Sequence, residues 1–207
     1  EQAQQQKEEI RARITDEKQL KNCLAKEKEF YAPYTLSLRY FKSVLMRDPG
    51  TVRWNYIKTL RKLEFYFNNR NKSFIYAMLN AIYARKFNSL GLKLGIELDR
   101  NVFDEGLMIF HAQGVVVNGD VKVGKNCILH GGNVIGNMGN DLKVPVIGNN
   151  VRLGTGAKVL GDVYIADGVQ IGAGAVVLDS CYEKGALLVG IPARVHKKDS
   201  EKNSIEM

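Results

Sequence analysis

The three histidines, His111, His130 and His196, are the side chains of this sequence best suited to move a proton near neutral pH. An unperturbed imidazole changes its charge near pH 6.5. His111 stands in the stretch GLMIFHAQGVVVN, residues 106–118, at the entrance to a region rich in glycine and valine. Two hypotheses follow for it: a general base that takes the proton of a hydroxyl, or a buried histidine that only packs.

The three cysteines, Cys23, Cys127 and Cys181, are an odd number and have no Cys-x-x-Cys spacing. This argues against a disulfide framework and against a zinc ribbon, and it favours a reducing cytoplasm. The histidines contain no close pair, so we expect no metal site.

Size and hydropathy predict one substantial core, or two small domains that share an interface, since 45% of the 207 residues are hydrophobic. No window approaches the roughly 18 consecutive apolar residues of a membrane span. The first residues, EQAQQQKEEIRARI, are too polar for a secretory signal, and without an initiator Met they leave open whether residues precede them.

The net charge of +8 is concentrated in the N-terminal half. Residues 51–100 are the densest part, with ten basic residues against three acidic ones. Such a surface attracts an acidic substrate, a membrane surface or nucleic acid, and a solvated helix face is the alternative. Because no nucleic-acid-binding motif accompanies the charge, we expect no nucleic acid partner.

Residues 1 to about 90 have the periodicity of helices. One predicted helix opens at Thr15, with Lys18 where a capping box would have an acid. The stripe of the next is apolar and predicts core: Trp54, Ile57, Leu60, Leu63, Tyr66 and Phe67. The last is expected to stop at Gly91 and Gly95.

Beyond about residue 107 an aliphatic residue recurs at every sixth position. The residues of this series are Val117, Val123, Leu129, Ile135, Ile147, Leu153, Val159, Ile165, Ile171 and Val177. One inward aliphatic per six residues is typical of a short strand followed by a turn, and three strands make a triangular coil of about 18 residues. We expect about four coils over 111–178, with Cys127 and Cys181 as small core residues.

The stretch NMGNDLKVPV, residues 137–146, interrupts the repeat while conserving its phase. An acid, Asp141, occupies the in-phase position, and Pro145 cannot donate to a strand ladder. We therefore predict a loop that covers something, because irregular connections tend to carry function.

The phase of the repeat makes predictions about the two histidines. Six residues before Val117 lies His111, which strict phase would point inward, although the preceding segment lacks the repeat. His130 follows the inward Leu129, one coil and one residue after His111, so its side chain is expected to face outward, nearly over His111. It is a candidate ligand for the acceptor or a surface histidine, and we assign no role to His196.

Three stretches, GLMIFHAQGVVVNGDVKVGKNCILHGGNVIG, PVIGNNVRLGTGAKVLGDVYIADGVQIGAGAVV and GIPARV, resemble the hexapeptide-repeat acyltransferases. The resemblance covers roughly 90–196 and is closest to the serine acetyltransferase branch, including its relatives in capsule and exopolysaccharide gene clusters. It implies an α+β fold: a helical domain (1–95), a left-handed parallel β-helix of hexapeptide repeats (96–196) and a charged tail (197–207).

The resemblance also implies acetyl-CoA as the donor, without a metal, and His111 as the general base, with His130 beside it. Asn118 and Lys143 would bind the acceptor. Residues implied for the donor are Gly136, Thr155 and Ala173 on the pantetheine arm, Pro192 at the adenine, and Arg194, Lys197 and Lys198 near the phosphates. Proteins of this family are usually homotrimers with active sites between subunits.

The sequence departs from serine acetyltransferases at the positions that orient the base and bind serine. Those enzymes have Asp residues at the positions of Phe110 and Ile96 and an Arg-His pair at Lys143 and Val144. An orienting acid would have to come from Glu97, Asp99, Asp104 or Glu105, or be replaced by a backbone carbonyl.

We therefore expect a cytoplasmic O-acetyltransferase that acts on a sugar hydroxyl of a capsular or extracellular polysaccharide or its precursor. The alternatives are a serine O-acetyltransferase of cysteine biosynthesis and a non-catalytic trimeric scaffold. A zinc enzyme of the γ-carbonic anhydrase type would need three histidine ligands, which this sequence does not group. Peripheral contact of the basic helices with a membrane is a further expectation.

Overall fold

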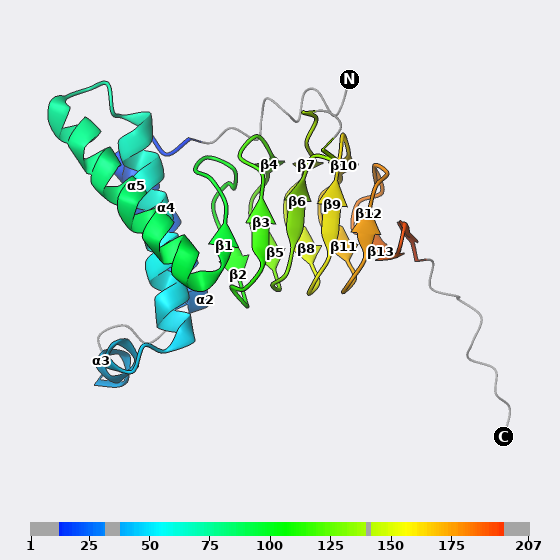
Figure 1. Ribbon diagram of the computed structural model, residues 1–207, viewed down its shortest axis with the longest axis horizontal. Coiled ribbons are helices and arrows are strands. Elements are labelled where there is room, and N and C mark those ends of the chain that lie inside the picture. The colour runs from blue at the N-terminus through cyan, green and yellow to red at the C-terminus, as the bar shows by residue number, and fades with distance from the viewer. Residues whose placement is uncertain (1–12, 32–37, 140–141, 197–207) are drawn as a thin grey trace, which may run out of the picture.

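The computed structural model describes residues 13–31, 38–139 and 142–196, and in this part of the chain helices are followed by a solenoid of short strands (Figure 1). The helices are α2 (Glu17–Tyr31), α3 (Leu38–Leu45), α4 (Pro49–Asn68) and α5 (Phe74–Leu94). None of them is both long and apolar enough to cross a membrane.

The helix ends follow from local hydrogen bonding. The capping residue of α2 is Asp16, not Thr15, because Asp16 and Gln19 each accept the other's backbone N–H. Gly95 ends α5 in the left-handed conformation, as predicted, with φ of 67°. The predicted stop at Gly91 is wrong: this glycine is buried within the helix, where a Cβ would lie 2.8 Å from the carbonyl oxygen of Ile96.

The strands form three parallel sheets, one along each side of the solenoid. The six-stranded sheet contains β2 (Met108–Ile109), β5 (Ile128–Leu129), β8 (Arg152–Leu153), β11 (Gln170–Ile171), β13 (Leu187–Gly190) and the antiparallel β14 (Ala193–Val195). The five-stranded sheet contains β1 (Ile96–Glu97), β3 (Val115–Val117), β6 (Val134–Gly136), β9 (Lys158–Leu160) and β12 (Val176–Val177). The three-stranded sheet contains β4 (Lys122–Val123), β7 (Val146–Ile147) and β10 (Tyr164–Ile165).

The six-residue series forms the core of the solenoid. All ten aliphatic residues predicted to point inward are buried. Cys127 and Cys181 are buried free thiols among them, and burial raises the pKa of Cys127 to about 12. A thiol with that pKa stays protonated at neutral pH, so Cys127 is a packing residue, as the repeat predicted.

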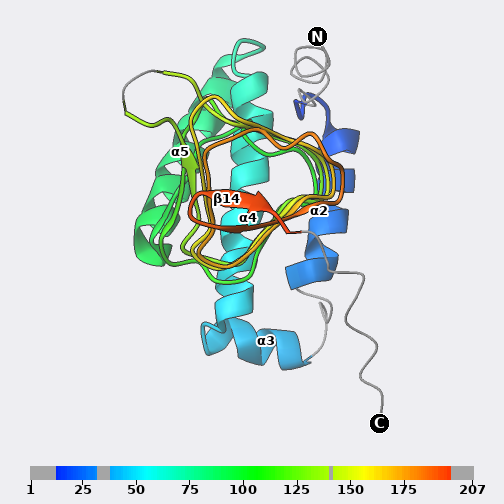
Figure 2. The ribbon, with the colours of Figure 1, turned by 90° about the vertical axis from the view of Figure 1, so that its right-hand side faces the viewer.

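The loop interrupts the solenoid without shifting its register. Val159 pairs with Val177, 18 residues later, whereas Ile135 pairs with Val159 across the loop, 24 residues later. The loop thus adds six residues to one coil, and in Figure 2 the chain on both sides of its centre projects away from the coils. Asp141 lies outside the described residues.

The first coil does not follow the strict phase. Ile109 occupies the inward position and pairs with Leu129, 20 residues later, whereas paired positions in a coil beyond the loop, such as Leu153 and Ile171, are 18 residues apart. His111, two residues after Ile109, is exposed. The inward orientation that strict phase would give His111 is therefore wrong.

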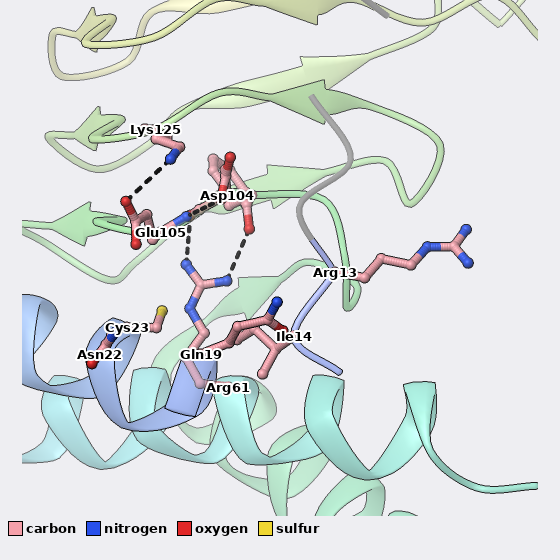
Figure 3. Close-up of a pocket in the computed structure, with 10 residues that line it drawn as sticks. Arg13, Ile14, Gln19, Asn22, Cys23, Arg61, Asp104, Glu105 and Lys125 are labelled. Carbon is pink, nitrogen blue, oxygen red and sulfur yellow. Dashed lines mark hydrogen bonds and ion pairs between the residues drawn. The ribbon is translucent and has the colours of Figure 1, made fainter. Parts of the chain in front are cut away.

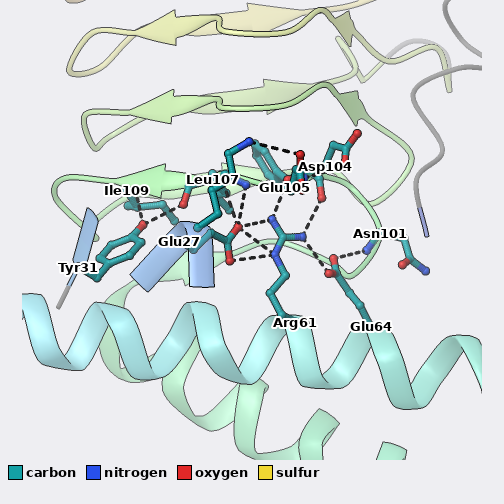
Figure 4. A network of polar contacts seen from close by, with 12 residues as sticks. Glu27, Tyr31, Arg61, Glu64, Asn101, Asp104, Glu105, Leu107 and Ile109 are labelled. Carbon is teal, nitrogen blue, oxygen red and sulfur yellow. Dashed lines mark hydrogen bonds and ion pairs between the residues drawn. The ribbon is translucent and has the colours of Figure 1, made fainter. Parts of the chain in front are cut away.

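A buried ionic network attaches the helices to this first coil (Figure 4). Arg61 of α4 pairs with Glu27 of α2 at 2.7 Å and with Glu64 at 2.8 Å, and it donates to the carbonyl oxygens of Phe103 and Asp104. Burial alone lowers the pKa of a guanidinium, but the two carboxylates hold the pKa of Arg61 above its ordinary value. The arginine therefore stays charged and paired.

The same helix α2 completes the free edge of β2. Glu27 accepts the backbone N–H groups of Gly106 and Leu107, and Tyr31 accepts that of Ile109 at 2.6 Å. One continuous core of buried side chains joins α4 and α5 to the coils. The division into domains 1–95, 96–196 and 197–207 stays a prediction, while the change from helix to strand lies between Leu94 and Ile96.

Candidate active site

The turns that lead from the six-stranded to the five-stranded sheet stack into one corner, which we call the histidine corner. It consists of residues 110–114, 130–133, 154–157 and 172–175. Each turn contains a glycine with positive φ: Gly114, Gly132, Gly156 and Gly174. These four glycines stack on successive coils, since a Cβ on each of the first three would lie 3.5–4.0 Å from the next glycine.

His111 is exposed in the first turn of this corner, directly opposite Gly131 of the next coil. A Cβ on Gly131 would lie 2.8 Å from both the Cβ and the carbonyl oxygen of His111, and the φ of Gly131 is 109°. Only glycine fits at that position. The contact sets the place of the His111 backbone while leaving its imidazole open to solvent.

His130 is half-buried, and its ring stacks on Phe110, with centroids 4.7 Å apart and an angle of 20° between the planes. It thus lies over Phe110, one residue from the position predicted for it. Burial, the positive charge of Arg152 and the neighbouring His111 together lower the pKa of His130 below its ordinary value. At neutral pH His130 is therefore an uncharged imidazole, which can donate and accept a hydrogen bond.

No carboxylate of the described residues forms a hydrogen bond with the His111 imidazole. Two of the candidate orienting acids are engaged elsewhere. Asp99 bonds to Arg100, and Glu105 pairs with both Lys26 and Lys125 at 3.3 Å. The place that an acid would occupy next to His111 holds the Phe110 ring.

Thr155 and Ala173 lie on the histidine corner, on successive coils and both exposed. The backbone N–H of Gly174 donates to the carbonyl oxygen of Thr155 at 2.8 Å, and a Cβ on Gly154 would approach the nitrogen of Ala173 to 2.6 Å. These close backbone contacts leave a row of small residues along the corner, on the same side as the two histidines. A thin ligand arm could lie along it.

Pro192 and Arg194 continue from this corner at the end of the solenoid. Pro192 lies in the turn between β13 and β14, and β13 pairs with β11. Arg194 is exposed and pairs with Asp179 at 2.7 Å. Lys197 and Lys198 lie outside the described residues.

Asn118, Gly136 and Lys143 lie on a different corner, where the five-stranded sheet turns into the three-stranded one; we call it the loop corner. A Cβ on Gly136 would touch the Cβ of Asn118 at 3.4 Å, so these two stack on successive coils. Lys143 pairs with Asp162 at 3.0 Å. Within one chain, the width of the five-stranded sheet separates all three residues from His111.

Sequence reasoning missed Arg152 and Gly131. Arg152 occupies the outward position of β8, paired in register with Ile128, and its charge acts on His130. The residue directly before each inward aliphatic points outward, and aligning these positions of the repeat would have placed Arg152 in that row. No sequence pattern indicated the role of Gly131, because its close contact with His111 depends on the two additional residues in the first coil.

A pocket of about 220 Å³ lies at the third corner, between α2 and the first coils (Figure 3). Its lining includes Cys23, Arg61, Glu105 and Lys125, and it contains none of the predicted site residues. Burial alone raises the pKa of a carboxyl, but Lys26 and Lys125 hold the pKa of Glu105 below its usual value. Among the described residues, no group of three His, Cys, Asp or Glu could hold a metal ion.

Comparisons with known proteins point to one group. The family model for the bacterial transferase hexapeptide (six repeats) matches residues 145–179. Serine acetyltransferase from Staphylococcus xylosus is 33% identical over 98 residues, which are 46% of this chain and 43% of that protein. Serine acetyltransferase from Helicobacter pylori is 34% identical over 103 residues, or 44% of this chain and 60% of that protein.

A solved structure of a serine acetyltransferase in complex with CoA superposes with a TM-score of 0.60 at 20% identity, covering 87% of this chain and 71% of that one. This likeness confirms the helical region followed by a left-handed β-helix. The chain spans less than two thirds of the length of the two curated relatives. The predicted resemblance to hexapeptide-repeat transferases of the serine acetyltransferase type is confirmed, whereas the relatives give no support to a closer match with capsule enzymes.

Proposed function

We propose that this chain, a hexapeptide-repeat transferase similar to serine acetyltransferases, is an acetyl-CoA-dependent O-acetyltransferase with His111 as its general base. The observation that carries the proposal is the exposed imidazole of His111, whose backbone and Cβ lie against Gly131 beside the row of small residues at Thr155 and Ala173. A base must reach both solvent and substrate, and a buried histidine would not.

The reaction follows from ordinary acyl transfer. The acceptor hydroxyl attacks the thioester carbonyl while the His111 imidazole takes its proton, and the collapse of the tetrahedral adduct breaks the C–S bond. The imidazolium then returns the proton to the departing CoA sulfur. Backbone N–H groups at the glycine turns are the candidate donors to the oxyanion. Neutral His130 contributes a hydrogen bond to the acceptor without repelling the imidazolium.

We propose two classes of acceptor, serine and a sugar hydroxyl. The relatives are named serine acetyltransferases, which favours serine over the sugar hydroxyl expected from the sequence. Phe110 favours a sugar, because its ring stacks on His130 where serine enzymes place an acid. An exposed aromatic ring is also a surface on which a sugar ring packs well.

The test is release of free CoA thiol with serine or a panel of glycans as acceptor. Replacement of His111 by Ala is expected to lower kcat by about 10²–10⁴, and because the side chain is exposed, the thermal transition should be unchanged. The matched control is His196→Ala, an exposed histidine outside the corner. A His111→Ala enzyme with full activity would remove the base from the mechanism.

The placement of the site residues bears on how the subunits assemble. The predicted residues divide between two corners of the triangular coil, and a threefold ring would bring the loop corner of one subunit to the histidine corner of the next. We therefore propose a homotrimer with shared sites. The buried free thiols of Cys23, Cys127 and Cys181 support a cytoplasmic location.

A further inference from the structure

The surface of the α4–α5 hairpin is unusually one-sided in charge. Residues 49–94 contain nine lysines and arginines but a single acid, Glu64, which is buried against Arg61. In the described part of the chain, Arg61 is the only residue of this hairpin whose cation takes part in an ion pair with a carboxylate. The accessible surface of the hairpin is therefore basic, because its own sequence contains no acid besides the buried Glu64.

The lysines gather on one side of the hairpin. Lys62 of α4 reaches α5, where its Nζ donates to the Tyr83 hydroxyl at 3.4 Å. Burial and then the charges of Lys62 and Lys86 lower the pKa of Lys58. Arg85 and Lys93 are exposed on the same helix α5. Cations that repel one another in the free protein gain energy when an anionic surface approaches.

The outer face of α5 is also apolar. Its large exposed side chains are Phe74 (81% exposed), Ile75 (61%), Met78 (45%), Ile82 (52%) and Leu92 (86%). Helical geometry places Phe74, Met78, Arg85 and Leu92 on one stripe, opposite Phe87 and Gly91, which are buried against the rest of the protein. Phe74, Ile75 and Met78 lie in the first two turns, and Arg85 and Lys86 separate them from Leu92 in the last turn.

We propose that this face of α5, with the lysines beside it, docks the protein on an anionic membrane surface. Exposed aromatic and aliphatic side chains flanked by Lys and Arg, without acids, are the composition of a helix that lies in the headgroup region of a bilayer. A second copy of the chain is the weaker occupant, because two such faces packed together would bring like charges into contact. A soluble anionic polymer would use the cations but leave Phe74 and Ile75 uncovered.

The experiment is co-sedimentation of the full chain with vesicles, either of phosphatidylcholine alone or of equimolar phosphatidylcholine and phosphatidylglycerol. Binding to the anionic vesicles only, weakened by added salt, is the expected result. The affinity of the charge variant Arg85→Gln/Lys86→Gln for anionic vesicles is expected to fall by at least about tenfold. The affinity of the apolar variant Phe74→Ser/Ile75→Ser for anionic vesicles should also fall by at least about tenfold.

The control variants are Lys184→Gln and Leu142→Ser, which change one exposed cation and one exposed leucine on the solenoid. They should bind like the unaltered chain. The proposal is overturned if anionic vesicles do not bind the protein, or if the apolar variant binds them normally. It is equally overturned if the apolar variant only lowers the oligomeric mass measured by light scattering, because α5 would then cover a second copy. None of these readouts depends on acetyl transfer.

Discussion

The two histidines of the corner have contrasting surroundings that suit two different tasks. His111 is exposed, and its backbone and Cβ lie against Gly131 of the next coil. His130 is half-buried, stacked on Phe110 and held neutral by burial and by the charge of Arg152. A base needs freedom to reach the hydroxyl, whereas a positioning group needs a defined ring plane, so the proton transfer belongs to His111.

Gly131→Ala tests the contact that places His111. The added Cβ would lie 2.8 Å from His111 at a φ of 109°, so we expect a loss of about 2–4 kcal/mol in the free energy of unfolding and a lower kcat. Gly174→Ala is the control, because Gly174 also has a positive φ but a Cβ added there would have no atom within 4 Å. Urea denaturation of both variants measures the difference, and equal losses would show that the backbone conformation alone matters.

Arg152→Gln tests the electrostatics of His130. Removing a cation that disfavours the imidazolium should raise the pKa of His130 towards its ordinary value of 6.5. An NMR titration of the imidazole protons measures this shift, with Arg194→Gln as the control because Arg194 pairs with Asp179. An unchanged titration in Arg152→Gln would mean that burial alone holds the pKa down.

The lowered pKa of His130 also links stability to pH. The unfolded chain binds this proton more readily than the folded one, so the stability due to neutral His130 is present above pH 6.5. This contribution to stability is lost as the pH falls from 6.5 through the lower pKa that His130 has in the folded protein. Unfolding free energies measured across this window should decline less steeply in Arg152→Gln.

At the scale of elements, α2 takes the place of a preceding strand. Every later parallel strand of the six-stranded sheet pairs with the strand of the coil before it, but β2 has no such strand. Tyr31 accepts the N–H of Ile109 in β2, Glu27 accepts the two N–H groups directly before the strand, and Arg61 neutralises Glu27. The helices thereby set the geometry of the strand that leads directly into His111.

Tyr31→Phe tests this role of α2. The variant leaves the buried N–H of Ile109 and the carbonyl of Leu107 without their partner, so we expect a loss of about 1–3 kcal/mol in unfolding free energy. If β2 positions the base, kcat should fall while the KM for acetyl-CoA stays constant. Tyr182→Phe, at an exposed tyrosine, is the control. A loss of stability with unchanged kcat would limit Tyr31 to a structural role.

At the scale of the whole molecule, one chain carries the two halves of the proposed site on different corners. His111, His130 and Thr155 are on the histidine corner, whereas Asn118 and Lys143 are on the loop corner. We propose that the two corners meet between neighbouring subunits of a trimer.

Mixing two inactive variants provides that test. A trimer of His111→Ala and Lys143→Ala subunits should recover about a quarter of the activity, since one in four neighbouring pairs joins an intact His111 to an intact Lys143. The measurement is thiol release after the variants are unfolded and refolded together, with each variant refolded alone as the control. Mixed samples as inactive as the separate variants would place the whole site in one subunit.

The sequence by itself determined the solenoid, its buried aliphatic residues, the small cysteines and the loop, because each depends on neighbours within one repeat of the chain. Only the tertiary structure decided that His111 is exposed, that Gly91 lies inside a helix and that Arg152 acts on His130. These depend on contacts between distant segments: α2 and α4 support a first coil with two extra residues, and no local periodicity contains that shift.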